Sequence, residues 1–178
     1  MVPVGAGRVD RLPMPDDRPL AIIDLDGVVA DVRHRLRHLQ GRRKNWPAFF
    51  AAARHDDVHE EGVAVVETLA RDHEVVYLTG RPAHLRADTE AWLADHGLGG
   101  HRLVMRPEGD RRPAAVVKVE LLHELAAGRT VGVVVDDDPI VLEAMQRAGH
   151  PTFAAEWERR AEDSDRALQA AQEVEGRT

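Results

Sequence analysis

Short, uninterrupted apolar runs alternate along the chain with longer segments in which apolar residues recur every three or four positions. The runs are mostly β-branched or aliphatic, as expected for strands buried on both faces. They are Leu20–Ile23, Val75–Leu78, Leu103–Met105 and Val131–Val135. The periodic segments predict helices at about residues 61–71, 84–96, 115–127 and 139–148. This alternation predicts an α/β domain with an open, doubly wound parallel sheet.

Residues at the ends of the predicted helices agree with this division of the chain. Gly97 and Gly149 follow helix patterns where a left-handed C-cap is expected, and Pro139 stands where a first helical turn begins. The chain is accordingly expected to hold a flexible N-terminal segment, one folded domain and a C-terminal surface helix rich in Glu, Arg and Ala. These regions are residues 1–18, 19–155 and 156–178.

Length and composition are those of one soluble domain. A chain of 178 residues can bury a core without a second domain. No apolar run approaches the roughly 18 residues of a membrane span, and the N-terminus lacks the features of a secretory signal, so a cytoplasmic location is expected. The absence of cysteine excludes disulfides, thiolate nucleophiles and Cys-ligated metals. The chemistry must therefore rest on oxygen and nitrogen groups.

The net charge of -7 argues weakly against a nucleic-acid partner, but the charge is unevenly distributed. The stretch from Val32 to His55, called here the basic segment, holds no acidic residue. Its cations are Arg33, Arg35, Arg37, Arg42, Arg43, Lys44 and Arg54. Two interpretations stay open, a solvated helix face or a surface that flanks a binding site.

Polar residues directly follow three of the four predicted strands. In open α/β sheets, ligands bind at the carboxyl ends of the strands, so a functional site is expected to contain these residues. They are Asp24, Asp26 and Gly27 after the first strand, Thr79, Gly80 and Arg81 after the second, and Asp136, Asp137 and Asp138 after the last.

The acidic residues among them predict a metal site. Asp24 and Asp26 are two apart, so in an extended chain both carboxylates point to the same side, and Gly27 permits a sharp turn behind them. Carboxylates this close need a cation or a shared proton. With Asp136 and Asp137 they form an oxygen-only pocket that suits Mg²⁺ completed by a substrate phosphate. Helix caps or surface turns would explain any single Asp, but not the whole set.

Lys118 lies at the start of a predicted helix, after a loop that contains prolines. A lysine there could reach over the sheet edge and offset negative charge on a nucleophile and on a phosphate. Phosphoryl transfer depends largely on positioning and on this kind of neutralisation. Taken alone, Lys118 would be a surface lysine.

The order Asp24-x-Asp26-Gly27, Thr79-Gly80-Arg81, Lys118 and Asp136-Asp137 resembles the four motifs of the haloacid dehalogenase (HAD) phosphatases in sequence and spacing. The resemblance implies a HAD-type Rossmannoid fold and catalysis through an aspartyl-phosphate. The short intervals between the motifs leave room for little or no cap domain. An acid at the Asp26 position favours phosphate-ester hydrolysis over dehalogenation.

The resemblance also implies a role for each motif residue. Asp24 is the nucleophile, and Asp26 protonates the leaving oxygen and then activates water. Thr79 donates a hydrogen bond to the phosphoryl oxygens, and Lys118 stabilises Asp24 and the phosphate. Mg²⁺ is held by Asp24, by the main-chain carbonyl of Asp26, and by Asp136 and Asp137.

A narrower likeness is to the 3'-phosphatase domain of phage-type polynucleotide kinase. It is carried by residues 103–113, which lead to Val116-Val117-Lys118, and by the Thr79-Gly80-Arg81 stretch. The likeness implies that Gly80, Arg81 and Arg112 contact the phosphate and that the substrate is a 3'-phosphorylated nucleic-acid end. The chain carries Ala114-Ala115 where those relatives have an acidic residue. It has no G-x-x-x-x-G-K-[ST] loop, so the kinase half is not expected in it.

Three other functions are compatible with parts of this pattern. The same chemistry could act on a nucleotide or a sugar phosphate, which sequence separates poorly from a nucleic-acid end. A signalling receiver module is also doubly wound and acidic, but its acidic pair lies near the first strand, whereas here it follows the last strand placed. A catalytically silent phosphate-binding domain would not need every motif residue.

Overall fold

The structure, a computed structural model, describes residues 17–40 and 42–157. The strands are β1 (Leu20–Ile23), β2 (Ala30–Asp31), β3 (Asp57–Val58), β4 (Glu74–Pro82), β5 (Arg102–Arg106), β6 (Val131–Asp136) and β7 (Thr152–Ala154). The α-helices are α1 (Trp46–Ala52), α2 (Glu60–Leu69), α3 (Arg86–Asp95), α4 (Ala114–Leu125) and α5 (Pro139–Arg147). Three short 3₁₀ helices are η1 (Arg33–His38), η2 (Ala53–His55) and η3 (Ala83–Leu85).

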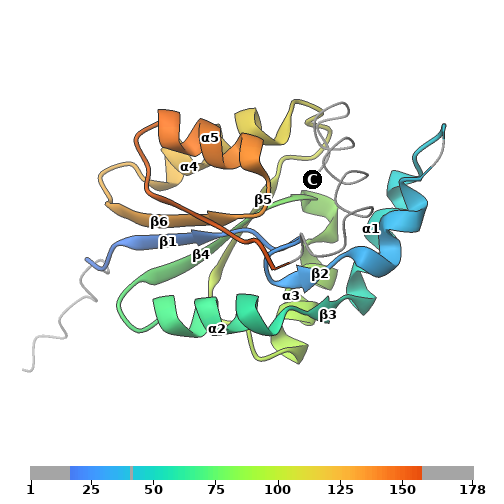
Figure 1. The fold of residues 1–178 in the computed structure, drawn as a ribbon, viewed down its shortest axis with the longest axis horizontal. Helices are drawn as coiled ribbons and strands as arrows, with labels where there is room; N and C mark the ends of the chain where they lie inside the picture. The colour runs from blue at the N-terminus through green and yellow to red at the C-terminus, as the bar shows by residue number, and fades with distance from the viewer. Residues whose placement is uncertain (1–16, 41, 158–178) are drawn as a thin grey trace, which may run out of the picture.

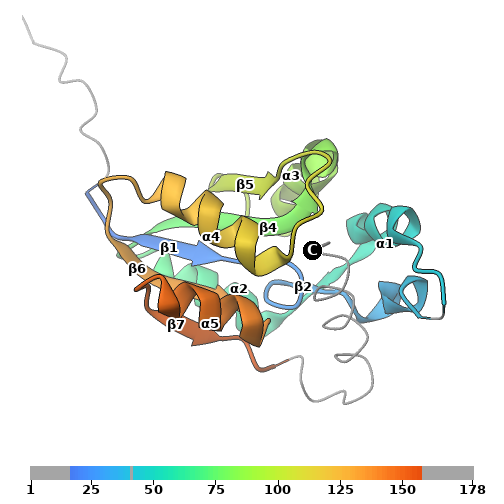
Figure 2. The same ribbon diagram turned by 90° about the horizontal axis from the view of Figure 1, so that it is seen from above.

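Five strands form a sheet in the order β5-β4-β1-β6-β7, and every neighbouring pair is parallel. Helices α4 and α5 cover one face, and α2 and α3 the other (Figures 1 and 2). Successive residues of β1 alternate between the two apolar cores: Ala21 and Ile23 pack on one side, Leu20 and Ile22 on the other. The predicted doubly wound sheet with strands buried on both faces is confirmed.

The sequence pattern located four of the five sheet strands and missed β7. The sequence of β7, Thr152-Phe153-Ala154, has no apolar run because it lies at the edge of the sheet, where Phe153 is 48% exposed. The predicted left-handed residues are confirmed at Gly97 (φ 71°) and Gly149 (φ 89°). Pro139 lies in the first turn of α5, as expected.

Strands β2 and β3 pair antiparallel and form a small second sheet that the sequence pattern did not reveal. The basic segment lies between them in sequence and folds as η1, α1 and η2 (Figure 1). Its apolar cluster is Val32, Leu36, Leu39, Trp46, Phe49 and Phe50. Within residues 17–40 and 42–157, this small helical unit is the part that stands over the end of the sheet, in line with the expectation of little cap.

Two glycines fix the loop that follows β1. Gly27 has a φ of 82°, a conformation that side chains other than glycine rarely adopt. Gly62 of α2 packs so closely that a Cβ atom there would lie 2.0 Å from the carbonyl oxygen of Val28. The loop is therefore held between the sheet and α2, which places the residues around Asp26.

The predicted N-terminal segment lies almost entirely outside the described residues. Glu156 and Trp157 are not helical, and the rest of the predicted C-terminal helix also lies outside. Within the described ranges, none of the helices combines the length and the apolar character needed to cross a bilayer.

Candidate active site

The motif residues meet at the carboxyl ends of three adjacent strands. Strand β1 lies at the centre of the sheet, between β4 and β6. The later strands β4 and β5 lie on one side of β1, and β6 and β7 on the other. Asp24 follows β1, Thr79 lies near the end of β4, and Asp136 is the last residue of β6. All three are at most 5% exposed. This is the position where ligands bind in doubly wound sheets.

Asp24, Asp136, Asp137 and Lys118 form one group, called here the acidic cluster. The Lys118 ammonium lies 2.9 Å from Asp24 Oδ2 and donates to Asp136 Oδ2 at 2.8 Å. Lys118 reaches this position from the second turn of α4 and is 4% exposed. The acidic cluster thus has one ammonium, which contacts two of its three carboxylates. The sequence-based expectation that Lys118 approaches the nucleophile position agrees with this geometry.

Burial and charge act in opposite directions on the ionisable groups of the acidic cluster. Burial of the Asp24 carboxyl group outweighs the attraction of Lys118 and raises its pKa to about 7. For Lys118, burial favours the neutral amine, but Asp136 and Asp24 outweigh it and raise the pKa of the ammonium group. The lysine is therefore charged, and the carboxylates keep an excess of negative charge.

The acidic cluster has the donors that a hard divalent cation requires. One carboxylate oxygen from each of Asp24, Asp136 and Asp137 lies within 4.8 Å of the others. Asp24 Oδ1 is buried and accepts no hydrogen bond. A buried carboxylate oxygen without a partner, among other oxygen ligands and next to excess negative charge, fits Mg²⁺. Asp26 is not part of this group, because its side chain turns elsewhere.

Asp26 instead belongs to a second group of buried charges, the arginine cluster, with Arg35, Asp56 and Arg81. Asp26 Oδ1 accepts hydrogen bonds from Arg35 Nη2 at 2.6 Å and from Arg81 Nε at 2.8 Å. Asp56 binds Arg35 through both carboxylate oxygens at 2.8 Å, and Asp56 Oδ2 binds Arg81 Nη2 at 3.0 Å. None of the four residues is more than 3% exposed. Two carboxylates and two guanidinium groups balance in charge.

The two carboxylates of the arginine cluster titrate in opposite directions. Burial would raise the pKa of Asp26, but Arg35 and Arg81 outweigh it and lower this pKa to about 2. For Asp56, burial prevails over the attraction of the same arginines and raises the pKa. Asp26 is therefore ionised in this structure. Its Oδ2 atom is buried and accepts no hydrogen bond.

Local structure brings the two arginines together. The register between β4 and β5 shifts after Thr79, so Gly80 and Arg81 have no partners in β5, and this irregularity re-aims Arg81. Arg35 comes from η1, and its guanidinium lies 4.1 Å from the centre of the Phe49 ring. Asp56 precedes β3 and accepts a hydrogen bond from Trp92 Nε1 on its backbone oxygen at 2.9 Å.

The other predicted substrate-binding residues lie in different surroundings. Gly80 is buried and follows Thr79 directly. Arg112 is exposed, and its guanidinium pairs with Asp110 at 2.6 Å and with Glu120 at 2.6 Å. The phosphate contact expected for Arg112 therefore stays a prediction. Of Ala114-Ala115 at the start of α4, Ala114 is buried in the apolar core and Ala115 packs against it partly buried.

Sequence reasoning missed two residues of the site, Arg35 and Asp56. Arg35 was noticed only as one cation of the basic segment, and Asp56 was not singled out. Arg35 is fully buried, whereas Arg33 and Arg37 beside it are exposed. A usable signal was the position of Arg35 next to Leu36, between Val32 and Leu39, at the spacing of a buried helix face. Neither interpretation of the basic segment had foreseen an arginine inside the site.

The fold and the order of the motif residues define the class of this protein, a HAD phosphatase domain. The chain belongs to the family described as the polynucleotide kinase PNKP phosphatase domain, whose model matches residues 19–157. A comparison with curated proteins finds no match.

Solved structures with the same fold include two of the Pnkp1/Rnl/Hen1 complex. One, of the RNA repair complex, superposes with a TM-score of 0.64 at 23% identity, over 86% of this chain and 48% of that chain. The other gives 0.63 at 25% identity, over 84% and 51%. This chain thus spans about half the length of these two. A haloacid dehalogenase-like hydrolase from Streptococcus pneumoniae gives 0.55 at 9% identity, over 78% and 84%, which shows the fold alone.

Proposed function

We propose that this protein is a Mg²⁺-dependent phosphomonoester hydrolase that removes the 3'-phosphate from nucleic-acid ends through an aspartyl-phosphate. The observation that carries the proposal is the state of Asp24. Its Oδ2 atom lies beside the Lys118 ammonium, whereas its Oδ1 atom is buried without a hydrogen bond. A buried carboxylate that lies beside an ammonium group and is not saturated by hydrogen bonds can act as a nucleophile towards phosphorus.

The reaction has two displacements at phosphorus. In the first, a carboxylate oxygen of Asp24 forms a bond to phosphorus, the ester P–O bond breaks, and the leaving oxygen takes a proton from Asp26. In the second, water attacks the same phosphorus, gives a proton to Asp26, and the bond between phosphorus and Asp24 breaks. Inorganic phosphate and the alcohol are the products, and both carboxyl groups return to their starting state.

Asp26 must hold a proton in the first displacement, although the arginine cluster keeps it ionised before substrate arrives. A phosphate dianion next to Asp26 adds negative charge and competes for Arg35 and Arg81. Both effects raise the pKa of Asp26 towards the value that a general acid needs. The two arginines thus hold Asp26 in place and offer guanidinium donors to phosphate, which binds such groups in bidentate fashion.

Asp24, Asp136 and Asp137 would hold the metal ion. Mg²⁺ bound there would neutralise part of the negative charge, keep Asp24 ionised and orient the phosphoryl oxygens. Lys118 adds a fixed positive charge on the other side of Asp24. Thr79, buried at the end of β4, is the proposed hydrogen-bond donor to the phosphoryl group.

Three observations support a nucleic-acid end over a small phosphate ester. The chain belongs to a family of phosphatase domains of polynucleotide kinase. Two structures with the same fold come from a complex whose name includes RNA repair. Among the described residues, the small helical unit formed by residues 32–40 and 42–55 stands over the end of the sheet without a larger cap, which leaves room for a polymer at the site.

The experiment that tests this function measures phosphate release with Mg²⁺ from a 3'-phosphorylated oligonucleotide and from a panel of mononucleotides and sugar phosphates. Asp24→Asn is the inactive variant, and Asp57→Asn changes an exposed aspartate as the matched control. We expect release from the oligonucleotide to be fastest, to need Mg²⁺, and to disappear only in Asp24→Asn. A clear preference for a sugar phosphate would show that the substrate is a small phosphate ester and not a nucleic-acid end. If no ester releases phosphate with Mg²⁺, the proposed phosphatase activity is refuted.

A further inference from the structure

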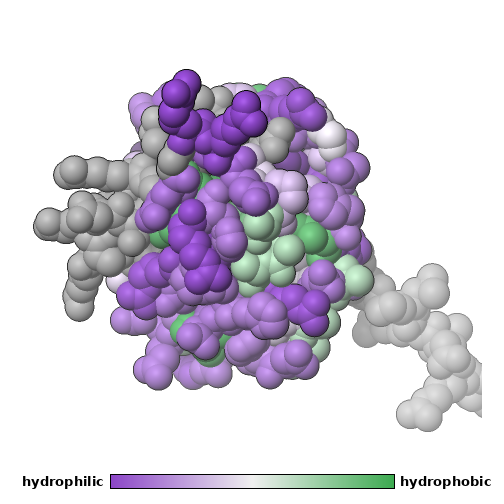
Figure 3. Space-filling model, turned by 90° about the vertical axis from the view of Figure 1, so that its right-hand side faces the viewer, coloured by the Kyte–Doolittle hydropathy of each residue, from purple (hydrophilic) through white to green (hydrophobic). Residues whose placement is uncertain are grey.

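A cavity of about 490 Å³ lies beside the phosphate site, between α1 and the loops that follow β4 and β5. It is lined by Trp46, Pro47, Phe50, Ala51, Arg54, Gly80, Pro82, His84, Leu85, Asp88, Arg106, Glu108, Gly109, Asp110 and Arg111. Figure 3 shows the face of the molecule on the α1 side: pale green to green patches near its centre are surrounded by purple. None of the residues predicted to act in catalysis lines this cavity.

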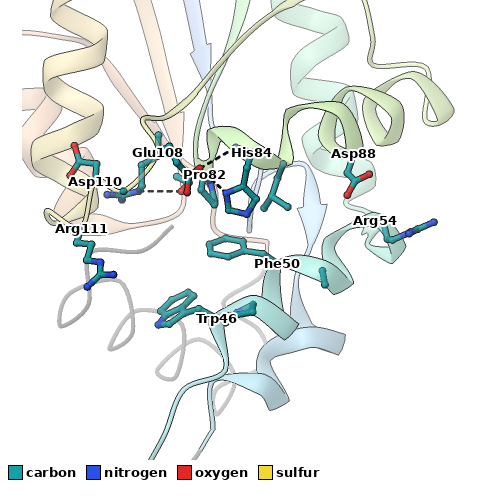
Figure 4. A pocket seen from close by; sticks show the side chains of 15 residues that line it. Trp46, Phe50, Arg54, Pro82, His84, Asp88, Glu108, Asp110 and Arg111 are labelled. Atoms are coloured by element: carbon teal, nitrogen blue, oxygen red, sulfur yellow. Dashed lines mark hydrogen bonds and ion pairs between the residues drawn. The ribbon is translucent and has the colours of Figure 1, made fainter.

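The cavity has an aromatic floor. Trp46 and Phe50 of α1 point towards the loops that carry His84, Glu108 and Arg111 (Figure 4). The two rings are stacked, with centroids 5.7 Å apart and planes inclined by 28°. Both residues also belong to the apolar cluster of the small helical unit, which fixes their orientation. A rigid aromatic floor favours a flat ring as the ligand.

The charges around this floor balance. The lining holds Arg54, Arg106 and Arg111 and an equal number of acids, Asp88, Glu108 and Asp110. Glu108 lies 2.7 Å from His84 Nδ1, and Asp110 also pairs with Arg112 beside the cavity. A site for a polyphosphate or a second phosphate group would carry an excess of cations. Balanced charge around an aromatic floor instead suits an uncharged ring with donors and acceptors on its edge.

The wall of the cavity is continuous with the phosphate site. Gly80 lines the cavity, and it is the residue between Thr79 and Arg81. Arg106 also lines it and donates from Nε to the Gly80 carbonyl oxygen at 3.2 Å. On α1, Phe49 contacts the Arg35 guanidinium, whereas Phe50 faces the cavity. A group bound in the cavity therefore lies next to a phosphate bound at Asp24.

We infer that this cavity holds the nucleoside that carries the phosphate, with its base against the aromatic floor. The inference rests on the proposed function and adds the place where the base of the terminal nucleoside is held. The volume lies in the range of about 300–1,000 Å³ that is usual for small-ligand sites. Base stacking on aromatic side chains tolerates every base, so the site selects a nucleoside without selecting a sequence.

The first experiment fills the cavity and compares two secondary phosphate esters, a 3'-phosphorylated oligonucleotide and glycerol 2-phosphate, which has no base. Ala51→Phe places a ring in the cavity from an exposed position of α1. We expect the ratio of kcat/KM for the oligonucleotide to kcat/KM for glycerol 2-phosphate to fall about tenfold, the effect of losing one stacked base.

The matched control is Ala91→Phe, the same change at an exposed position of α3 that does not line the cavity. It should leave this ratio unchanged. Phe50→Leu removes the ring but keeps most of its apolar volume, and it should lower the ratio in the same direction as Ala51→Phe. Thermal unfolding verifies that each variant is folded. An unchanged ratio in folded Ala51→Phe overturns the inference.

A binding experiment separates this inference from the phosphatase itself. Calorimetric titration of Asp24→Asn with a nucleoside 3'-monophosphate needs no turnover. We expect binding tighter than that of glycerol 2-phosphate, and weakened about tenfold when Ala51→Phe is added. If the wild type releases no phosphate but the nucleoside 3'-monophosphate still binds more tightly than glycerol 2-phosphate, the cavity inference is supported and the proposed function is refuted. Equal binding of both ligands overturns the cavity inference whatever the wild type hydrolyses.

Discussion

The acidic cluster and the arginine cluster are both buried groups of charges, and they differ in how the charge is balanced. In the acidic cluster one ammonium contacts two of three carboxylates, and a carboxylate oxygen of Asp24 is left without a hydrogen bond. In the arginine cluster two guanidinium groups share two carboxylates, with contacts of 2.5 to 3.0 Å. The first group is short of positive charge. In the second, positive and negative groups are equal in number, although Asp26 Oδ2 and Arg35 Nη1 have no hydrogen-bond partner.

The difference indicates different tasks. A buried excess of negative charge is unfavourable until a cation enters, so the acidic cluster is arranged for a ligand. A balanced and mutually hydrogen-bonded group fixes geometry, and it holds Asp26, Arg35 and Arg81 in a single arrangement. The acidic cluster should therefore govern activity and metal binding, whereas the arginine cluster should also govern stability.

The largest expected effect concerns the one cation of the acidic cluster. Lys118→Met removes the charge beside Asp24 that is proposed to stabilise the phosphoryl group, and we expect kcat to fall by about 10²–10³-fold. Phosphate release from glycerol 2-phosphate at saturating Mg²⁺ measures the effect. Arg102→Met, which removes an exposed cation at the start of the edge strand β5, is the control. A loss below about fivefold would mean that Lys118 only stabilises the fold.

The arginine cluster is tested through stability. Asp56→Asn removes one of the two buried carboxylates and leaves Arg35 and Arg81 with Asp26 alone. We expect the free energy of unfolding in urea to fall by about 3 kcal/mol, the usual effect of breaking a buried ion pair. Asp57→Asn changes the exposed neighbour and should stay within about 0.5 kcal/mol of the wild type. Equal effects of the two substitutions would contradict the distinction between the clusters.

Magnesium should stabilise the protein through the acidic cluster alone. At a Mg²⁺ concentration about a hundred times Kd, binding to the folded state contributes about 2.7 kcal/mol, which raises Tm by about 5 to 10 °C. Scanning calorimetry with EDTA or with Mg²⁺ measures the shift. Asp137→Asn should reduce the shift, and Asp57→Asn should preserve it. If Mg²⁺ raises the Tm of Asp137→Asn as much as that of the wild type, Asp137 does not bind the metal ion.

The smallest expected effect concerns the ion pair between Arg112 and Asp110 at the surface. Hydrogen bonds from the Arg112 side chain and backbone lower the pKa of Asp110 to about 2. In Arg112→Ala an NMR titration of the Asp110 carboxyl group should give a pKa closer to its ordinary value of 3.8.

The direction of the pH effect follows from this shift. Because the pKa of Asp110 is lower in the folded state, its contribution to stability is complete above about pH 4 and is lost as the pH falls towards 2. The contribution should be small because solvent screens the pair. An unshifted pKa for Asp110 in the wild type would show that the ion pair does not form in solution. Arg112 would then be available for the phosphate contact that the sequence predicts.

Much of the fold could be predicted because its signals are local. The strands β1, β4, β5 and β6 are short apolar runs, and a residue such as Pro139 marks a helix start within a few positions. Strand β7 could not be predicted in this way, since an edge strand of three residues buries too little to need an apolar run. The pair β2 and β3 was missed for a similar reason, because each has two residues.

The sequence by itself determined the acidic cluster, because Asp24, Asp136 and Asp137 directly follow strands whose ends must meet in a parallel sheet. Only the tertiary structure decided the arginine cluster. Its formation depends on the pairing of β2 with β3, which brings Asp56 to Arg35, and on the register shift in β4, which turns Arg81 towards Asp26. Neither event leaves a periodic pattern in the chain. An arginine in a cationic stretch therefore became a buried partner of Asp26 only when the chain folded.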